Sequence, residues 1–209
     1  MLDLKRFVPN GRVSTGLLAW RAGRLVWAIS QRKYWQNDGR QTVIPLVGIG
    51  GGQEAGETLT DAVRREAMEE AQSRIAIRGA RGTLWVNADT GVVEQRDLAA
   101  ALDGEAAPLL VWQMHLSLRN DDGTPRELDY INPVYEADLL DEPRPGAETP
   151  GLLHVAPGTY LELADEPRTL SELLQTGAIY TGADLPPDCL LITQGSALFL
   201  ARYWQRLQR

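Results

Sequence analysis

The sequence contains a single cysteine, Cys189, in 209 residues. One thiol excludes a disulfide framework within the chain and is typical of proteins from a reducing compartment. No apolar run approaches the roughly 20 residues that a membrane-spanning helix needs. The first residues, MLDLKRFVPNG, lack the apolar core of a secretory signal peptide. We therefore expect a cytoplasmic protein without a membrane segment.

Lysine is also scarce, since only Lys5 and Lys33 among the 21 cationic side chains are lysines. The 28 acidic side chains outnumber the cationic ones and give a net charge of −7. An acidic balance of this kind argues against a broad nucleic-acid-binding surface and against binding to anionic membranes.

Internal repeats and low-complexity tracts are absent, and 44% of the residues are hydrophobic. This length and composition predict one globular domain over residues 1–209. The segment 140–151, LDEPRPGAETPG, is rich in proline and glycine and predicts a mobile surface loop. A linker is the alternative, although little chain follows it for a second domain.

The apolar patterns predict strands on both sides of one central helix, with further helices near the end. Ala22-Gly23 predicts a tight hairpin, and Pro45 predicts an edge position or a bulge for its strand. The charged segment 119–129 is expected to form a loop. The expected strands cover 13–20, 24–31, 42–49, a run from Ile75 to Ile77, 82–87, 108–118 and 130–139, and the expected helices cover about 58–71, a short patch at 97–102, 169–177 and 193–208.

The central helix carries a cluster of carboxylates. Thr58 or Thr60 can cap its start, and Leu59, Val63, Ala67 and Ala71 form one apolar stripe. On the neighbouring face, Glu66, Glu69 and Glu70 stand at positions i, i+3 and i+4. Like charges held this close repel one another unless a cation lies among them, and carboxylate oxygens suit Mg²⁺. The pattern predicts a divalent-metal site, although glutamates at this spacing also occur on solvated helix faces.

Two other glycine motifs overlap the start of this helix, and neither fits. Residues 51–58 have the spacing of a phosphate-binding P-loop, but Glu57 stands where a lysine must reach the phosphates. Residues 50–55 fit a loose dinucleotide-binding fingerprint, but the acidic residue it requires would be Glu69 or Glu70, inside a helix. Both alternatives are excluded.

The stretch 51–73, GGQEAGETLTDAVRREAMEEAQS, resembles the signature of the Nudix hydrolase family, the Nudix box. The residues in register with that signature are Gly51, Glu57, Arg65, Glu66, Glu69 and Glu70. The stretch departs from the signature at Ala67, a small version of an aliphatic position, and at Gln72 and Ser73, which replace a glycine and an aliphatic residue. These departures lie in packing positions and at the helix end.

The resemblance implies an α+β Nudix fold, a mixed β-sheet sandwiched between helices (α/β/α), with the box as a loop–helix–loop. It also implies a pyrophosphatase that cleaves a nucleoside diphosphate linked to another group and uses Mg²⁺ or Mn²⁺. Glu66, Glu69 and Glu70 would hold the metal. Arg65 would pair with Glu57 and hold the helix against the loop, while Gly51 and Gly52 let the backbone approach the ligand closely.

Several points stay open from the sequence. The general base would be a box glutamate or a carboxylate such as Glu127 or Asp129. Arg32, Tyr34 and Trp35 are weak candidates for substrate binding, because an aromatic side chain beside a cation can stack a base. The favoured reading of Trp35 is that it covers the edge of the core. The extra length at 119–151 raises a nucleoside diphosphate sugar as one substrate hypothesis.

Three alternatives concern function and assembly. A Nudix-like sensor would bind a nucleotide without cleaving it, but such modules usually lack box carboxylates, and all are present here. RNA decapping, also found in the family, would need a basic track that this acidic chain does not show. A homodimer is a further hypothesis, because Nudix proteins often dimerise and because one apolar helical stripe could form a subunit contact. This Trp204 stripe consists of Ala197, Leu200, Ala201, Trp204 and Leu207.

Overall fold

The computed structural model describes residues 4–8, 11–37, 39–98, 102, 105–119 and 123–208. Its strands are β1 Arg12–Val13, β2 Gly16–Arg21, β3 Arg24–Ile29, β4 Gln36–Asn37, β5 Thr42–Val47, β6 Ile75–Arg78, β7 Thr83–Asn87, β8 Val93–Arg96, β9 Leu110–Arg119, β10 Pro125–Leu139, β11 Gly151–Val155, β12 Arg168–Thr169, β13 Ile179–Gly182 and β14 Leu190–Thr193. The helices are η1 Leu4–Phe7, η2 Arg32–Tyr34, α1 Leu59–Ala71, α2 Pro157–Asp165, α3 Leu170–Gln175, α4 Ser196–Arg202 and α5 Trp204–Leu207.

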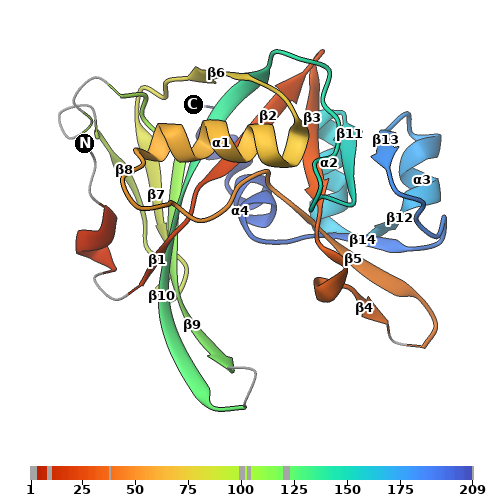
Figure 1. Cartoon of the computed structure of the whole chain (residues 1–209), viewed down its shortest axis with the longest axis horizontal. Coiled ribbons are helices and arrows are strands. Elements are labelled where there is room, and N and C mark those ends of the chain that lie inside the picture. Colours follow the sequence, from red (N-terminus) through yellow and green to blue (C-terminus); the bar gives the residue numbers. More distant parts are fainter. Residues whose placement is uncertain are drawn as a thin grey trace.

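A mixed sheet forms the centre of the molecule (Figure 1), with the strand order β12-β14-β5-β3-β2-β10-β9-β7-β8. The predicted hairpin between β2 and β3 is present, and Ala22 and Gly23 both adopt positive φ angles, as a tight turn of this kind requires. Strand β10 pairs in parallel with β1 and β2. The N-terminal strands are thereby held beside a strand from the second half of the chain.

The prediction that Pro45 marks an edge strand or a bulge is wrong. Strand β5 lies inside the sheet, with β14 on one side and β3 and β4 on the other, and its pairing with β14 is regular. The carbonyl of Pro45 accepts a hydrogen bond from the Ser30 N–H. Because N–H and C=O of one strand residue point the same way, the missing N–H of Pro45 faces the junction where β3 ends and β4 begins. The Ser30 carbonyl on that side accepts a hydrogen bond from the Trp35 indole instead, at 2.8 Å.

Two apolar cores cover the two faces of the sheet. In β3, Trp27 packs in the core that α2, α3 and α4 also fill, while Val26 and Ala28 pack in the core that contains the apolar stripe of α1. Alternation along the strand therefore buries both faces. The expected α+β arrangement, a mixed sheet between helices, is confirmed (Figure 1).

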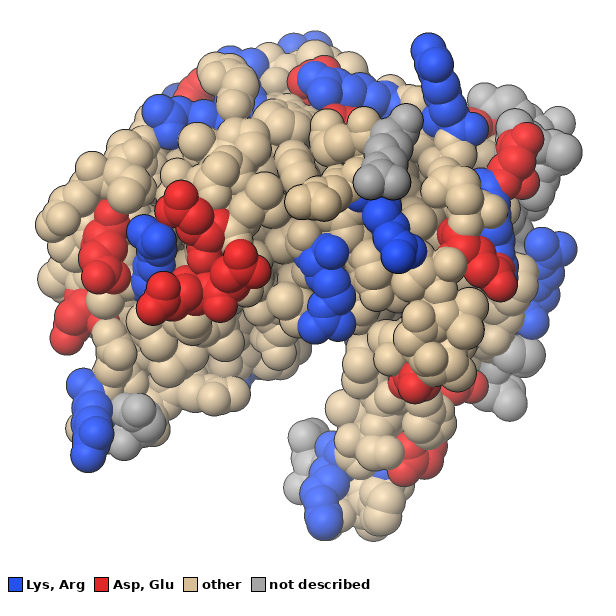
Figure 2. Space-filling model, turned by 180° about the vertical axis from the view of Figure 1, so that it is seen from behind, with Lys and Arg blue, Asp and Glu red and all other residues tan. Residues whose placement is uncertain are grey.

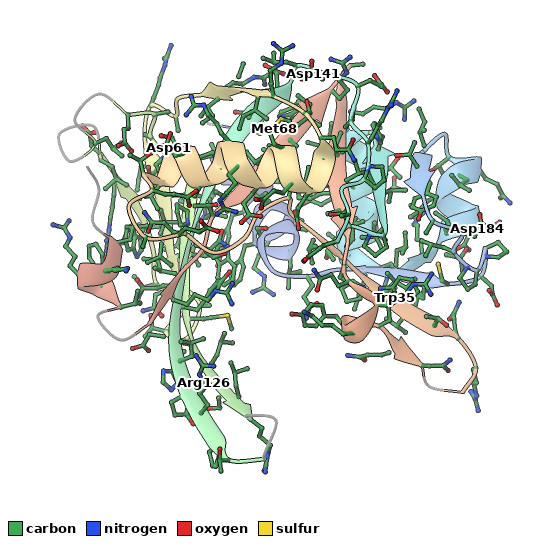
Figure 3. The ribbon with its side chains drawn as sticks, viewed as in Figure 1. Trp35, Asp61, Met68, Arg126, Asp141 and Asp184 are labelled. Atoms are coloured by element: carbon green, nitrogen blue, oxygen red, sulfur yellow. The ribbon has the colours of Figure 1, made fainter. Side chains whose placement is uncertain are left out.

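The segment expected to form a charged loop at 119–129 is mostly strand. Strand β9 continues to Arg119 and β10 begins at Pro125, so β9 pairs along its whole length with residues 125–134 of β10 as a hairpin. Figure 1 shows this hairpin projecting from the body of the molecule, and Figure 3 places Arg126 in the projecting part, away from α1. Cross-strand partners explain the difference, because Glu127 and Asp129 both contact His115 on β9.

The end of the chain also differs from the expected single helix at 193–208. Thr193 is the last residue of β14, so the helical part begins only at Ser196. It breaks at Tyr203 into α4 and α5. The predicted stripe is nonetheless internal: Trp204 contacts Trp20 and Tyr160, with ring centroids 6.4 and 6.0 Å apart. The break turns Trp204 toward the core formed by α2 and α4.

Other predictions fare differently along the chain. The helix near 169–177 is confirmed as α3, which begins with a capping box between Thr169 and Glu172. The helical patch at 97–102 falls partly outside the described residues, and Leu102 lies in a turn. Helix α2 and strands β11 to β14 had no sequence prediction. Among the described residues, no helix is long and apolar enough to cross a membrane.

Candidate active site

Helix α1 begins and ends where its side chains dictate. Of the two cap candidates, Thr58 fills the role, because its side chain accepts a hydrogen bond from the Asp61 N–H. The stripe from Leu59 to Ala71 is buried, so one face of the helix is fixed against the sheet. Gln72 then adopts a left-handed conformation, φ 48° and ψ 38°, at the position where the Nudix box has a glycine. The helix therefore ends as the signature requires, without that glycine.

The glycine loop before α1 lies against β2. The Leu17 N–H donates to Ile49 O, and the Thr15 N–H and the Ser14 hydroxyl both donate to Gly51 O. A Cβ at Gly51 would lie 2.2 Å from a carboxylate oxygen of Glu66. Only a glycine allows this approach, so the loop and the buried face of α1 meet at Gly51.

Arg65 gathers the carboxylates of the box. Its guanidinium donates to both oxygens of Glu57 at 2.7 and 3.1 Å, to Glu66 at 2.8 Å and to Glu69 at 2.9 Å. It also donates to Gly52 O at 2.8 Å, which ties the helix to the loop. The hydrogen bond from Arg65 lowers the pKa of Glu57. The pairing that the resemblance implied between Arg65 and Glu57 is present.

Two carboxylates of the cluster are destabilised by burial. Burial raises the pKa of Glu66 even though Arg65 counteracts it, and Glu66 is only 8% exposed. Burial also raises the pKa of Glu70 to about 7, with smaller contributions from Glu66, Glu69 and Glu148, while the Gly50 N–H donates to Glu70 at 2.9 Å and opposes the rise. Three carboxylates share one guanidinium and Glu70 lies beside them, so the cluster carries excess negative charge.

This donor set fits a divalent cation by its chemistry. Carboxylate oxygens on consecutive turns of one helix are the ligands that Mg²⁺ and Mn²⁺ prefer, and a cation would relieve the cost of burying Glu66 and Glu70. Among the described residues, no group of three histidine, cysteine, aspartate or glutamate side chains is gathered closely enough to hold a metal. Arg65 occupies the space between Glu66 and Glu69 and supplies the positive charge there.

The segment 140–150, which has no regular structure, is fastened to the end of α1. The Gly146 N–H donates to Glu70 O, the Arg144 N–H donates to Ala71 O, and the Gln72 side chain donates to Pro145 O. A Cβ at Gly146 would lie 1.6 Å from the carbonyl oxygen of Glu69. The middle of the expected loop is therefore hydrogen-bonded to the end of helix α1.

Glu148 joins this segment to the weak substrate-binding candidates. Its carboxylate accepts a hydrogen bond from the Gln31 side chain at 2.9 Å, so residues 31–35 lie near the end of α1. Tyr34 is 57% exposed, whereas the Trp35 indole donates to Ser30 O and its ring packs against the core. The reading of Trp35 as a cover for the core edge is confirmed. Arg32 lies over the Trp35 ring, 5.3 Å from its centroid.

The remaining candidate base residues lie elsewhere. Glu127 and Asp129 sit on the projecting hairpin, where each accepts a hydrogen bond from His115, at 2.7 and 2.8 Å. Arg65 brings together Gly52, Glu57, Glu66 and Glu69, and Gly51 lies against Glu66. Glu70 accepts a hydrogen bond from the Gly50 N–H beside them. Sequence reasoning missed Arg12 and Glu148, whose positions beside the box depend on contacts between distant segments and leave no signal in the sequence pattern.

No family model and no curated protein matches the chain. Comparison with solved structures finds a hydrolase of the NUDIX family from Clostridium perfringens, with a TM-score of 0.46 and 16% identity over 96% of this chain and 99% of that one. It also finds a MutT NUDIX hydrolase from Burkholderia pseudomallei, with a TM-score of 0.35 and 19% identity over 92% and 95%.

A NUDIX hydrolase from Nitrosomonas europaea aligns with a TM-score of 0.39 and 16% identity over 71% of this chain. The alignment spans 59% of that protein's length. These solved structures are Nudix hydrolases. Their TM-scores are all below 0.5, so any assignment of activity rests on the residues of the box.

Proposed function

We propose that this chain is a Nudix-type pyrophosphohydrolase that uses Mg²⁺ or Mn²⁺ to cleave a nucleoside diphosphate linked to another group. The observation that supports the proposal best is the convergence of the box residues. Arg65 ties Glu57, Glu66 and Glu69 to one another and to the carbonyl of Gly52. Residues placed at fixed spacing in the sequence therefore form one charged cluster at a glycine loop.

In this proposal Glu66, Glu69 and Glu70 hold the metal. When bound, a divalent cation neutralises phosphate oxygens and orients the attacking water. Arg65 is a positioning residue, because its five donors fix the carboxylates relative to the loop. Gly51 lets the Glu66 carboxylate, and Gly52 the Arg12 guanidinium, approach the backbone of the loop closely. Among the candidates for the general base we favour a box glutamate, because Glu127 and Asp129 are already engaged with His115.

The test is product release from a panel of nucleotides in the presence of Mg²⁺ or Mn²⁺. The panel contains ADP-ribose, nucleoside diphosphate sugars, NADH, dinucleoside polyphosphates and the common triphosphates. Glu69→Gln should lower turnover at least about 100-fold. Changing a residue that only supports the metal ligands costs up to about this much, and Glu69 is proposed to be a ligand itself. Glu94→Gln is the control, because the partner of Glu94 is Arg96, in an ion pair away from the box. Preferential turnover of triphosphates would contradict the diphosphate-sugar hypothesis.

A nucleotide sensor is the competing function. A sensor would bind one member of the panel tightly, release no product and need no metal, and Glu69→Gln would leave that binding intact. The retained carboxylates favour the hydrolase, because a site that only binds a polyanion gains nothing from buried negative charge. Equal binding with and without metal, and no product, would overturn the proposal.

Location and assembly remain predictions. A cytoplasmic location fits the single cysteine, which is buried. Figure 2 shows basic side chains separated by acidic and neutral surface on one face of the molecule, without a continuous basic track. The homodimer hypothesis has lost one of its grounds, because the Trp204 stripe packs within the chain. Light scattering of the purified protein measures the mass directly.

A further inference from the structure

Arg12 is a cation placed directly at the glycine loop of the box. A Cβ at Gly52 would lie 3.1 Å from Nη2, 3.6 Å from Nε and 3.7 Å from Cζ of Arg12, so the guanidinium lies against Gly52. The guanidinium of Arg65 donates to the carbonyl of the same residue. Two guanidinium groups therefore contact Gly52, one at its Cα and one at its oxygen.

The two arginines differ in their partners. Arg65 is satisfied by three carboxylates, at N–O distances of 2.7 to 2.9 Å. Arg12 is exposed, and within the described part of the chain its side chain makes no ion pair, hydrogen bond or ring contact. Its donors remain available to a ligand, and a guanidinium fork matches two oxygens of a phosphate group.

The backbone of Arg12 is held in place opposite the loop. Strand β1 pairs with β10, with Arg12 opposite Tyr130. The Gln53 N–H donates to Val13 O at 3.2 Å, and Ser14 forms a bridge with Gly52. The position of Arg12 is therefore set by main-chain bonds on both sides, and removing its side chain leaves those bonds in place.

Charge gives this cation a role. The box places the carboxylates of Glu57, Glu66, Glu69 and Glu70 around one guanidinium, and this excess of negative charge repels a polyanionic substrate. Metal ions bound by Glu66, Glu69 and Glu70 would lie toward the helix. We propose that Arg12 binds the non-bridging oxygens of the substrate's diphosphate on the Gly52 side of the loop. This inference rests on the proposed function for its substrate class. It makes Arg12 a substrate-binding residue outside the box.

The experiment compares Arg12→Ala, Arg12→Lys and the control Arg81→Ala, which removes an exposed arginine in the loop between β6 and β7. For the best substrate of the nucleotide panel, Arg12→Ala should raise KM about tenfold or more, the effect of one lost charge-assisted hydrogen bond, with a smaller change in kcat. Arg12→Lys should recover part of that loss. Circular dichroism and thermal melting verify that all three variants fold.

A second readout is independent of turnover. Binding of ADP with Mg²⁺ is measured by calorimetry on the wild type and the same variants, and Arg12→Ala should weaken it by a factor similar to the change in KM. If the wild type hydrolyses its substrate and Arg12→Ala behaves like Arg81→Ala in both assays, the inference fails and the hydrolase stands.

The remaining outcomes separate the two proposals. If the wild type releases no product but binds ADP with Mg²⁺, and Arg12→Ala weakens that binding, the hydrolase fails while the role of Arg12 in binding a diphosphate holds. If the wild type neither cleaves any member of the panel nor binds ADP, both proposals are overturned.

Discussion

Arg65 determines the charge balance of the box, and its loss should affect both stability and activity. Arg65→Ala leaves Glu57, Glu66 and Glu69 without their shared partner. The loss matters because the side chains of Arg65 and Glu57 are only 22% and 19% exposed, so water replaces the contact poorly. We expect the free energy of unfolding to fall by about 1.5–3 kcal/mol, the range for hydrogen bonds to charged groups. Urea denaturation measures it, and Arg168→Ala, which removes the ion pair with the exposed Glu162, should cost less than about 1 kcal/mol.

The same pair makes a prediction about pH. Because the pKa of Glu57 is lowered below its ordinary value of 4.5, the pair stabilises the folded chain above that value and loses its effect as the pH falls through the lowered pKa. The difference in stability between wild type and Arg65→Ala should therefore shrink in acid. A difference that stays constant down to the acid transition would show that Arg65 acts by packing alone.

At the scale of single residues, much of the arrangement of the site could be predicted from the sequence. The register of the box predicts the Arg65–Glu57 pair through its resemblance, and the spacing of Glu66, Glu69 and Glu70 predicts their common face. Arg12 and Glu148 could not be predicted. Each reaches the box through pairings between segments far apart in the chain, and local spacing contains no information on such contacts.

Among the elements, α1 and the segment 140–150 depend on each other. Gly146→Ala would place a Cβ 1.6 Å from the Glu69 carbonyl oxygen, a clash with backbone that no rotamer change relieves. The segment must therefore lift from the end of α1 and give up its bonds to Glu70 and Ala71. We expect a loss of about 2 kcal/mol or more, comparable to overpacking in a core, and a drop in hydrolysis.

Gly79→Ala is the matched control for this prediction, since a Cβ at Gly79 meets no atom within 4 Å. Thermal melting and the hydrolysis assay should show no loss for this variant. Equal melting temperatures for Gly146→Ala and Gly79→Ala would mean that the segment is not packed on α1 in solution.

Element boundaries were predictable where local chemistry sets them. Helix α1 begins at the Thr58 cap, and α3 begins at its capping box. Prediction failed where tertiary partners decide. Pro45 fits an interior strand because its neighbour changes from β3 to β4 beside it, and the charges of 125–129 pair across a hairpin. The break at Tyr203 follows from the position of Trp20 and Tyr160, which the helical spacing of 193–208 does not encode.

For the whole molecule, the two histidines of the chain have opposite effects on stability between about pH 5 and 8, a range in which Glu70, with its pKa raised to about 7, also titrates. Burial lowers the pKa of His154, so the unfolded chain takes up a proton there first and stability falls as the pH drops below 6.5. Hydrogen bonds to Asp129 and Glu127 raise the pKa of His115. Its contribution is complete below 6.5 and is lost as the pH rises through the raised pKa.

Single variants separate the two effects. His154→Phe should remove the loss of stability on the acid side, because Nε2 of His154 is buried without a partner among the described groups. His115→Asn should reduce the loss on the alkaline side, to which Glu70 also contributes because burial raises its pKa to about 7. Urea midpoints measured across this range test both. A wild-type profile that neither variant changes would show that these histidines have ordinary pKa values.

The parallel pairing of β1 and β2 with β10 has a consequence for how the protein folds. Gly16 lies opposite Val134, and the whole box lies in the stretch of chain between them. Closing so long a stretch is slow, because its entropy is lost before its contacts form. A folding intermediate that contains only α1 would lack Arg12 and the β2 contacts of the glycine loop, and it would be inactive. Recovery of activity after dilution from denaturant should therefore follow the slowest step of sheet assembly, so that catalysis reports the completion of folding.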